Sequence, residues 1–82
     1  MDKRLGFVGI IVEDRKKSGH AVNDVLSEFG DLIVGRMGIP NIARGHSVIT
    51  LIVDATTDQV GGLTGRLGTL DGVSVKSAMS KV

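Results

Sequence analysis

The sequence has no cysteine, and this absence removes several kinds of site at once. Disulfides, thiolate nucleophiles and cysteine-based zinc or iron–sulfur ligation are all excluded, and a cytoplasmic setting fits best. Aromatic residues are nearly as scarce, since Phe7 and Phe29 are the only two in the 82 residues. Because 41% of the residues are apolar, the core must consist mainly of valine, isoleucine and leucine.

The chain also lacks a strong excess of charge and a long hydrophobic run. Ten basic and nine acidic residues give a formal net charge of +1, which is too weak a field for unaided nucleic-acid binding. The first apolar run, Leu5 to Val12, ends at Glu13 and is too short to span a bilayer. We therefore expect no direct nucleic-acid binding, no membrane anchor and no signal peptide.

Hydrophobic patterning predicts four strands and two helices. Apolar runs rich in β-branched residues indicate strands, and apolar residues spaced three or four apart indicate helices. The expected strands are Leu5–Val12, Asp31–Ile39, His46–Asp54 and Val73–Met79, and the expected helices are Lys16–Phe29 and a segment from Thr56 to about Gly68. We expect the strand from His46 to lie near the centre of the sheet, because it has the highest β propensity.

Three local signals set the expected ends of these elements. Gly30 is the expected stop of the first helix, because glycine takes the left-handed conformation without a Cβ penalty. Pro40 is expected to end the second strand by removing a backbone donor, which leaves residues 40–45 as a loop. Thr56 and Gln59 match a capping box, and this pattern predicts the start of the second helix.

The element order βαββαβ in 82 residues corresponds to the ferredoxin-like split βαβ arrangement. Right-handed crossovers place both helices on one face of a four-stranded antiparallel sheet. The predicted fold class is therefore α+β, a two-layer sandwich. No linker or low-complexity tract divides the chain, and we expect one domain over residues 1–82.

The strands are apolar on both faces, which a two-layer fold does not require. In the first strand Val8, Ile10 and Val12 point one way, while Phe7 and Ile11 point the other way. A sheet covered by helices on one face only would leave the second set as an exposed apolar patch. We therefore expect a homo-oligomer, either a dimer or a tetramer, that buries the second face.

The segment GRMGIPN contains the candidate ligand site. Glycines within a strand often mark a bulge or a place where a ligand comes close, and an arginine between them offers a planar fork of donors to a carboxylate or phosphate. The predicted ligand-binding residues are Gly35, Arg36, Gly38, Asn41 and Arg44. The alternative is an edge strand whose arginine points to solvent or pairs with a neighbouring subunit.

The second helix is rich in glycine, which costs about 0.5 to 1 kcal/mol per residue relative to alanine. Gly61, Gly65 and Gly68 fall at positions i, i+4 and i+7 and form a smooth stripe on which another helix or the sheet can approach closely. The alternative is a loop that cradles an anion, but a phosphate loop follows a strand and precedes a helix.

No arrangement of residues indicates catalysis or metal binding. His20 and His46 are the only histidines, and a metal site would need a further donor close to them. Neither a serine or threonine with histidine and acid, nor paired carboxylates, occurs at a suitable spacing. We expect no enzyme activity, no metal and no cofactor.

The segments LGFVGIIVEDR, VGRMGIP, HSVITLIVDATTDQVGGLTGRLG and VSVKSAMSK, in this order, resemble the iron-only hydrogenase system regulator family. The resemblance covers nearly the whole chain. It implies a ferredoxin-like domain related to ACT-type modules and to the nickel-sensing domain of a ribbon-helix-helix repressor, which self-associate and bind effectors at subunit contacts. The nickel ligands of that relative are not matched, because Leu51 and Val53 stand on the corresponding strand.

The resemblance and the residues together predict a regulatory module. We expect an oligomer that binds a small-molecule effector near Gly35, Arg36 and Gly38 and thereby changes its affinity for a protein partner, including one through which it affects transcription. The alternative is an assembly or docking factor that binds a partner through its apolar sheet face without a ligand. An acylphosphatase-like hydrolase shares the element order, but VEDRKKSG does not match the phosphate-cradling loop of that enzyme.

Overall fold

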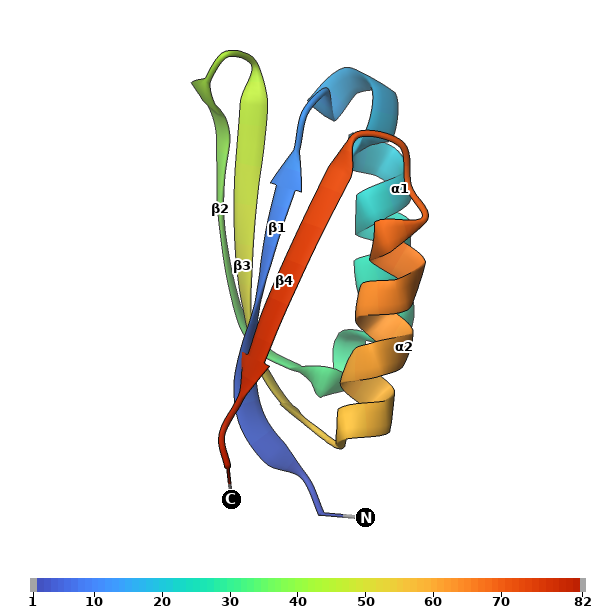
Figure 1. Cartoon of the computed structure of the whole chain (residues 1–82). Coiled ribbons are helices and arrows are strands. Elements are labelled where there is room, and N and C mark those ends of the chain that lie inside the picture. The colour runs from blue at the N-terminus through green and yellow to red at the C-terminus, as the bar shows by residue number, and fades with distance from the viewer. Residues whose placement is uncertain (1, 82) are drawn as a thin grey trace.

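The computed structural model describes residues 2–81 and contains four strands and two α-helices. In chain order they are β1 (Arg4–Val12), α1 (Arg15–Glu28), β2 (Ile33–Ala43), β3 (His46–Ala55), α2 (Thr57–Gly68) and β4 (Val73–Met79), with a short 3-10 turn at Gly30–Leu32 before β2. Figure 1 shows these elements as two layers, one of strands and one of helices. The predicted βαββαβ order is confirmed.

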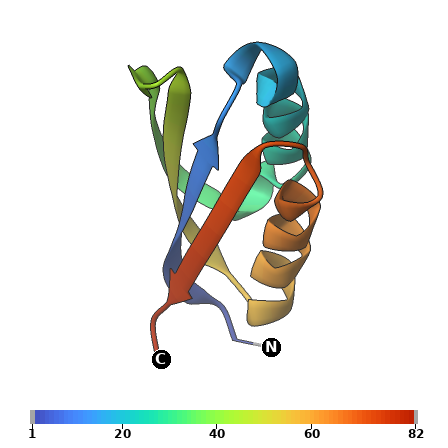
Figure 2. The same ribbon diagram turned by 45° about the horizontal axis from the view of Figure 1, so that its top comes forward.

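The strands form one antiparallel sheet in the order β2-β3-β1-β4. Both helices lie on the same face of this sheet, and Figures 1 and 2 show the other face without any covering element. β3 occupies an interior position, as its β propensity predicted. The predicted class, an α+β two-layer sandwich of ferredoxin-like type, is therefore confirmed.

Both helices begin at side-chain caps that the sequence encodes. The Asp14 carboxylate accepts hydrogen bonds from the backbone amides of Lys16 and Lys17 at 3.0 and 3.3 Å. The Thr56 hydroxyl accepts from the Gln59 amide at 3.1 Å, and the Gln59 side chain accepts from the Thr56 amide at 2.9 Å. The predicted capping box is thus formed, and it satisfies backbone donors that have no partner within the helix.

The hydrophobic core lies between the helices and the sheet face that they cover. Its buried hydrophobic side chains are Val8, Ile10, Val12, Val22, Val25, Leu26, Leu32, Leu51, Val53, Ala55, Val60, Leu63 and Leu67. All of them are aliphatic, as the scarcity of aromatic residues predicted, and Phe29 packs against them while remaining partly exposed. Alternate residues of the two central strands, β1 and β3, supply the sheet side of this core.

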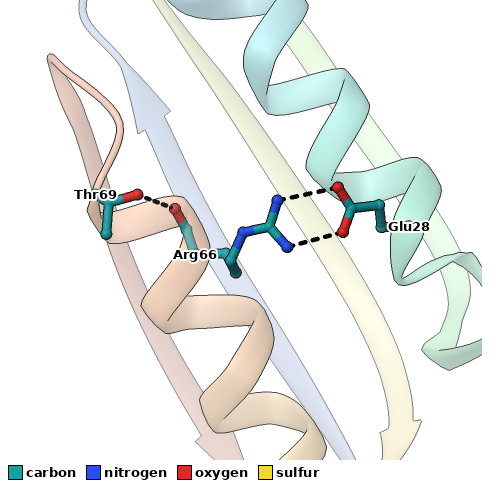
Figure 3. Close-up of polar contacts among 3 residues, drawn as sticks. All are labelled: Glu28, Arg66 and Thr69. Carbon is teal, nitrogen blue, oxygen red and sulfur yellow. Dashed lines mark hydrogen bonds and ion pairs between the residues drawn. The ribbon is translucent and has the colours of Figure 1, made fainter.

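A bidentate ion pair joins the two helices. Figure 3 shows the Arg66 guanidinium of α2 donating to both carboxylate oxygens of Glu28 in α1, at 2.8 and 3.0 Å. The hydrogen bond and the charge of Arg66 lower the pKa of the Glu28 carboxyl below its ordinary value. The Thr69 hydroxyl, also drawn, donates to the Arg66 backbone carbonyl and helps to close the end of α2. Lys17 and Asp71 form a second pair, between α1 and the turn before β4.

The prediction that Pro40 ends the second strand is wrong. β2 runs on to Ala43, and a tight turn at Arg44 and Gly45 leads directly into β3. Both turn residues have positive φ, 53° and 78°, as in the two-residue turns that match the twist of a hairpin. Pro40 is tolerated because β2 is an edge strand and because an irregularity between Ile39 and Ala43 interrupts the pairing there.

The expected left-handed stop at Gly30 is also wrong. Phe29 is the C-terminal cap of α1, and its amide donates to carbonyls of the last turn of the helix. Gly30 then starts the 3-10 turn that leads into β2, and positive φ among the described glycines occurs at Gly45 and Gly72. α2 likewise runs through Gly68 and is capped at Thr69. Gly30 and Gly68 therefore indicated correctly where each helix ends, but neither glycine takes the left-handed conformation.

The glycine stripe of α2 faces open space in the described part of the chain. A Cβ atom placed on Gly61, Gly65 or Gly68 would meet no side chain or distant backbone atom within 4 Å. The close approach of the helices occurs instead at Gly62, where a Cβ would lie 3.6 Å from the Phe29 ring. The expectation that the stripe packs on the sheet or on a second helix of this chain is therefore wrong, and α2 turns it outward.

The uncovered face of the sheet is strongly apolar, as the strand pattern predicted. We call it the apolar outer face, and its large exposed hydrophobic side chains are Leu5, Phe7, Ile11, Met37, Ile39 and Ile52. Phe7 is 54% exposed and Met37 is 67% exposed. These residues come from three adjacent strands, β2, β3 and β1, so they form one continuous surface.

Candidate functional site

A shallow groove lies on the helix side of the molecule, between α1 and the β2–β3 hairpin. One wall comes from Arg15, Gly19, Val22 and Asn23 of α1. The other comes from four residues of β2 and from residues 47–49 of β3, the β2 residues being Arg36, Gly38, Ile39 and Pro40. Its volume is about 180 Å³. Pockets for drug-sized ligands measure roughly 300–1,000 Å³, so this groove suits a small molecule or one portion of a larger one.

Arg36 reaches across this groove from β2. Its guanidinium donates a hydrogen bond of 2.8 Å to the side-chain oxygen of Asn23 in α1. Because that acceptor is a neutral amide, the arginine's charge is not compensated by it. Arg15 lines the same groove, and within residues 2–81 neither arginine forms an ion pair. The groove therefore presents guanidinium donors without an acidic partner.

A β-bulge directs Arg36 into this groove. Ile33 pairs with Val53 and Gly35 pairs with Ile52, so that β2 advances two residues while β3 advances one. The extra residue, Val34, reverses the inward and outward alternation for the rest of β2. Without it, Arg36 would share the outer face with Phe7, whereas in the structure it lies on the helix side, opposite Leu51.

The structure brings together two of the five predicted ligand-binding residues. Arg36 and Gly38 both line the groove, with Gly38 opposite Ile49 of β3. Gly35 pairs with Ile52 and lies on the outer face of the sheet. Asn41 has a φ of 51° and its amide donates to the Ser47 hydroxyl at 3.4 Å, while Arg44 stands in the hairpin turn. None of these last three residues lines the groove.

Sequence reasoning missed the groove residues that come from α1. Asn23 stands among other polar residues of the predicted helix, Arg15 lies just before the predicted start of that helix, and no motif separates them from their neighbours. A signal was present at Gly19, because a glycine inside a helix is unfavourable unless it makes room. A Cβ on Gly19 would lie 3.2 Å from the Arg15 side chain, and the glycine thus leaves the wall of the groove open.

The histidines do not take part in this groove. His20 lies 3.8 Å from Asp24, one helical turn further along α1, and His46 starts β3 beside the hairpin turn. Within residues 2–81, no three histidine, aspartate or glutamate side chains gather as a metal ion would require.

No helix in the described part of the chain is long and apolar enough to cross a membrane.

Solved structures with lower sequence identity share the fold. The ACT domain of the GTP pyrophosphokinase of Chlorobium tepidum superposes with a TM-score of 0.74 at 23% identity, over 93% of this chain and 99% of that domain. CPII, a nitrogen regulatory PII-like protein of Thiomonas intermedia K12 solved with ADP, AMP and bicarbonate, superposes with a TM-score of 0.55 at 19% identity, over 96% of this chain and 92% of that chain. No curated protein matches the sequence significantly.

A more similar structure is that of the uncharacterized protein TM1266 from Thermotoga maritima. It is 36% identical, covers 98% of this chain and 100% of its own, and superposes with a TM-score of 0.91. The TM1266-like family model, described as "Iron-only hydrogenase system regulator, putative", matches residues 4–77. This match agrees with the family resemblance of the sequence segments, and the chain belongs to the TM1266-like family.

Proposed function

We propose that this protein is a self-associating regulatory module of an iron-only hydrogenase system, and that a small anionic effector binds in the groove between α1 and the β2–β3 hairpin. The observation that carries the proposal is the Arg36 guanidinium, which lies in the groove against the neutral Asn23 amide rather than against an acid. The family description and the ACT-type fold support a regulatory role rather than a catalytic one.

The donors in the groove favour an anion. The guanidinium of Arg36 offers parallel N–H donors that fit a carboxylate or a phosphate, and Arg15 adds a second positive charge from the facing wall. The Asn23 amide group can donate as well, once its oxygen has accepted from Arg36. The volume of about 180 Å³ limits the effector to a small metabolite, such as a short carboxylic acid or a phosphate ester.

The position of the groove gives such a ligand a way to act. Its two walls belong to different elements, and the Arg36–Asn23 hydrogen bond joins them at 2.8 Å. A ligand that binds Arg36 competes with Asn23 for the same donors and changes the contact between the helix and the hairpin. A ligand shifts an equilibrium between two states only if it binds one of them more tightly. Here the two states are the protein with and without the Arg36–Asn23 hydrogen bond.

Thermal unfolding tests the groove directly. The probes are short mono- and dicarboxylates, inorganic phosphate, nucleotides and divalent metal ions, each added to the purified protein. A compound bound at 100 times its dissociation constant stabilises a protein by about 2.7 kcal/mol, so binding gives a clear rise in Tm. We expect a carboxylate or phosphate compound to give this rise.

Arg36→Ala should abolish the rise while the circular dichroism spectrum stays native, because Arg36 is exposed. Arg44→Ala removes the same charge from the hairpin turn, outside the groove, and should retain the full rise. If the compound stabilises Arg36→Ala as strongly as the wild type, the ligand binds elsewhere and the proposed site is wrong.

The apolar outer face favours a second candidate function, a docking factor that acts without a ligand. Six large hydrophobic side chains exposed on adjacent strands form the kind of patch that marks a protein interaction site. In that case no compound raises the Tm, and the protein stays monomeric until a partner covers the face.

A further inference from the structure

The apolar outer face carries two charged side chains among its hydrophobic ones. Asp54 of β3 and Lys76 of β4 both point to this side, since their strand neighbours Val53 and Val75 point toward the helices. Within residues 2–81, neither charge has an ion-pair partner. Both stand beside the central strand β1, Asp54 opposite Leu5 and Lys76 opposite Gly9.

The register places these two charges symmetrically about Phe7. Phe7 pairs with Ile52 of β3 on one side and with Ala78 of β4 on the other side. Asp54 lies two residues beyond Ile52, opposite Leu5, while Lys76 lies two residues from Ala78, opposite Gly9. Asp54 and Lys76 therefore lie on the two strands that flank β1. Each is two residues from the partner of Phe7 on its own strand, and the two displacements run in opposite directions.

Two glycines stand on the same face at positions where a side chain would fit. Gly9 and Gly35 both have ordinary negative φ angles, so their backbone conformation does not require glycine. A Cβ on either residue would meet its nearest neighbour at 3.9 Å, which is an ordinary contact. No contact among residues 2–81 requires glycine at these two positions. The absence of a side chain at Gly9, next to Phe7, and at Gly35, opposite Ile52, allows a facing surface to approach closely there.

We infer that the apolar outer face binds the same face of a second copy of this chain, with a twofold axis that passes close to Phe7. When this axis lies between the two faces and at right angles to the line from Asp54 to Lys76, it brings Lys76 of each copy over Asp54 of the other. The dimer then has two equivalent ion pairs beside an apolar centre. A twofold interface must be self-complementary, and one acid and one base on either side of an apolar centre meet this condition. The inference deepens the proposed self-association and is independent of the effector.

Charge reversal at these two positions tests the pairing. Lys76→Asp sets two acids against each other across the axis, and Asp54→Lys sets two bases against each other. Sedimentation velocity over a range of protein concentrations should show a dimer dissociation constant raised about tenfold or more in each single variant. The double variant, with both charges exchanged, should return to within about threefold of the wild type. Lys16→Asp, which makes the same charge change on α1, serves as the control and should leave dimerisation unchanged.

A mixture of the two single variants gives a sharper result. In the heterodimer both contacts pair an acid with a base, whereas each homodimer contains only repulsive pairs. Native mass spectrometry should therefore show mainly heterodimer. A statistical mixture of dimers, or unaltered dimerisation of both single variants, would mean that the copies meet through another surface. This result would overturn the inference, and it would leave the proposed effector site unaffected.

Phe7→Ala tests the apolar centre. Phe7 is 54% exposed in the single chain, so its removal should leave the fold intact by circular dichroism. It should raise the dimer dissociation constant about tenfold or more, because a large aromatic group is lost from the middle of the interface. A wild-type protein that stays monomeric at millimolar concentration overturns the inference, and binding of a carboxylate or phosphate in the groove can still be observed in that monomer.

Discussion

At the scale of single residues, Arg36 shows what a local sequence pattern can predict and what it cannot. An arginine between two glycines in an apolar strand was a good candidate for a ligand contact, and the structure places it in a groove. The face on which it lies could not be predicted, because a one-residue bulge at Val34 reverses the alternation of β2. Gly35, chosen for the same reason, points to the opposite face because neighbouring strand residues alternate, and its partner there is Ile52.

Glycines offer a test of packing at the same scale. A Cβ on Gly6 would lie 2.7 Å from the backbone carbonyl oxygen of Ala78 in the paired strand, and the backbone cannot yield easily. We expect Gly6→Ala to lower the free energy of unfolding by about 1–3 kcal/mol, as overpacked sites do. Urea denaturation at pH 7 measures this change.

Gly30→Ala is the matched control for Gly6→Ala. A Cβ on Gly30 meets nothing within 4 Å, and its φ is not positive. This substitution should therefore change the stability by less than about 0.5 kcal/mol. A large loss of stability in Gly30→Ala, or no loss in Gly6→Ala, would contradict this packing.

At the scale of elements, the outward glycine stripe of α2 weakens the helix, and within residues 2–81 no packing on the stripe compensates for this. Because nothing lies within 4 Å of a Cβ on Gly61 or Gly65, alanine fits at both positions. We expect each substitution to raise the free energy of unfolding by about 0.5–1 kcal/mol, in line with helix propensity. Chemical denaturation of the single and double variants should give nearly additive gains, and a loss of stability would show that the stripe is in contact.

The N-terminal cap of α2 is a second test at this scale. Thr56→Ala removes the hydroxyl that accepts from the Gln59 amide at 3.1 Å. We expect a loss of about 1 kcal/mol in the free energy of unfolding, as for other capping threonines. Thr56→Ser keeps the acceptor and should retain most of the stability in the same urea titration.

The ion pair between the helices makes stability depend on pH. Arg66 lowers the pKa of the Glu28 carboxyl in the folded protein, mainly through the hydrogen bond and then through its charge. A group with a depressed folded pKa stabilises the protein above its unfolded pKa, and the contribution is lost as the pH falls through the folded pKa. The wild type should therefore lose part of its advantage over Glu28→Gln as the pH drops below the ordinary carboxyl value of 4.5.

Melting temperatures at pH 7 and at pH 3 measure this difference. Glu28→Gln should melt below the wild type at pH 7, and the gap in Tm should narrow at pH 3, because the contribution of a carboxyl with a lowered folded pKa declines once the pH is below the unfolded value. Glu13→Gln is the control, because the Glu13 carboxylate has no ion-pair partner among residues 2–81. A gap at pH 3 as wide as at pH 7 would mean that the pair contributes through packing rather than through charge.

At the scale of the whole molecule, the two faces of the sheet have different surroundings but a similar composition. The helices cover one face, and the apolar outer face stays open in the single chain (Figure 2). Because association of folded copies stabilises the folded state by mass action, we expect the Tm to rise with protein concentration. Calorimetry over a hundredfold range of concentration checks this prediction, and a constant Tm would contradict it.

The sequence by itself determined the element order, the aliphatic core, the capping box and the apolar outer face. These features depend on the periodicity of side chains and on bonds between residues close in the chain, which act wherever the segment lies. The tertiary structure alone decided that β2 continues past Pro40, that Arg36 turns toward Asn23, and that Asp54 and Lys76 flank Phe7. Each of these depends on the register between strands distant in sequence, and one bulge residue is enough to change a side chain from one face to the other.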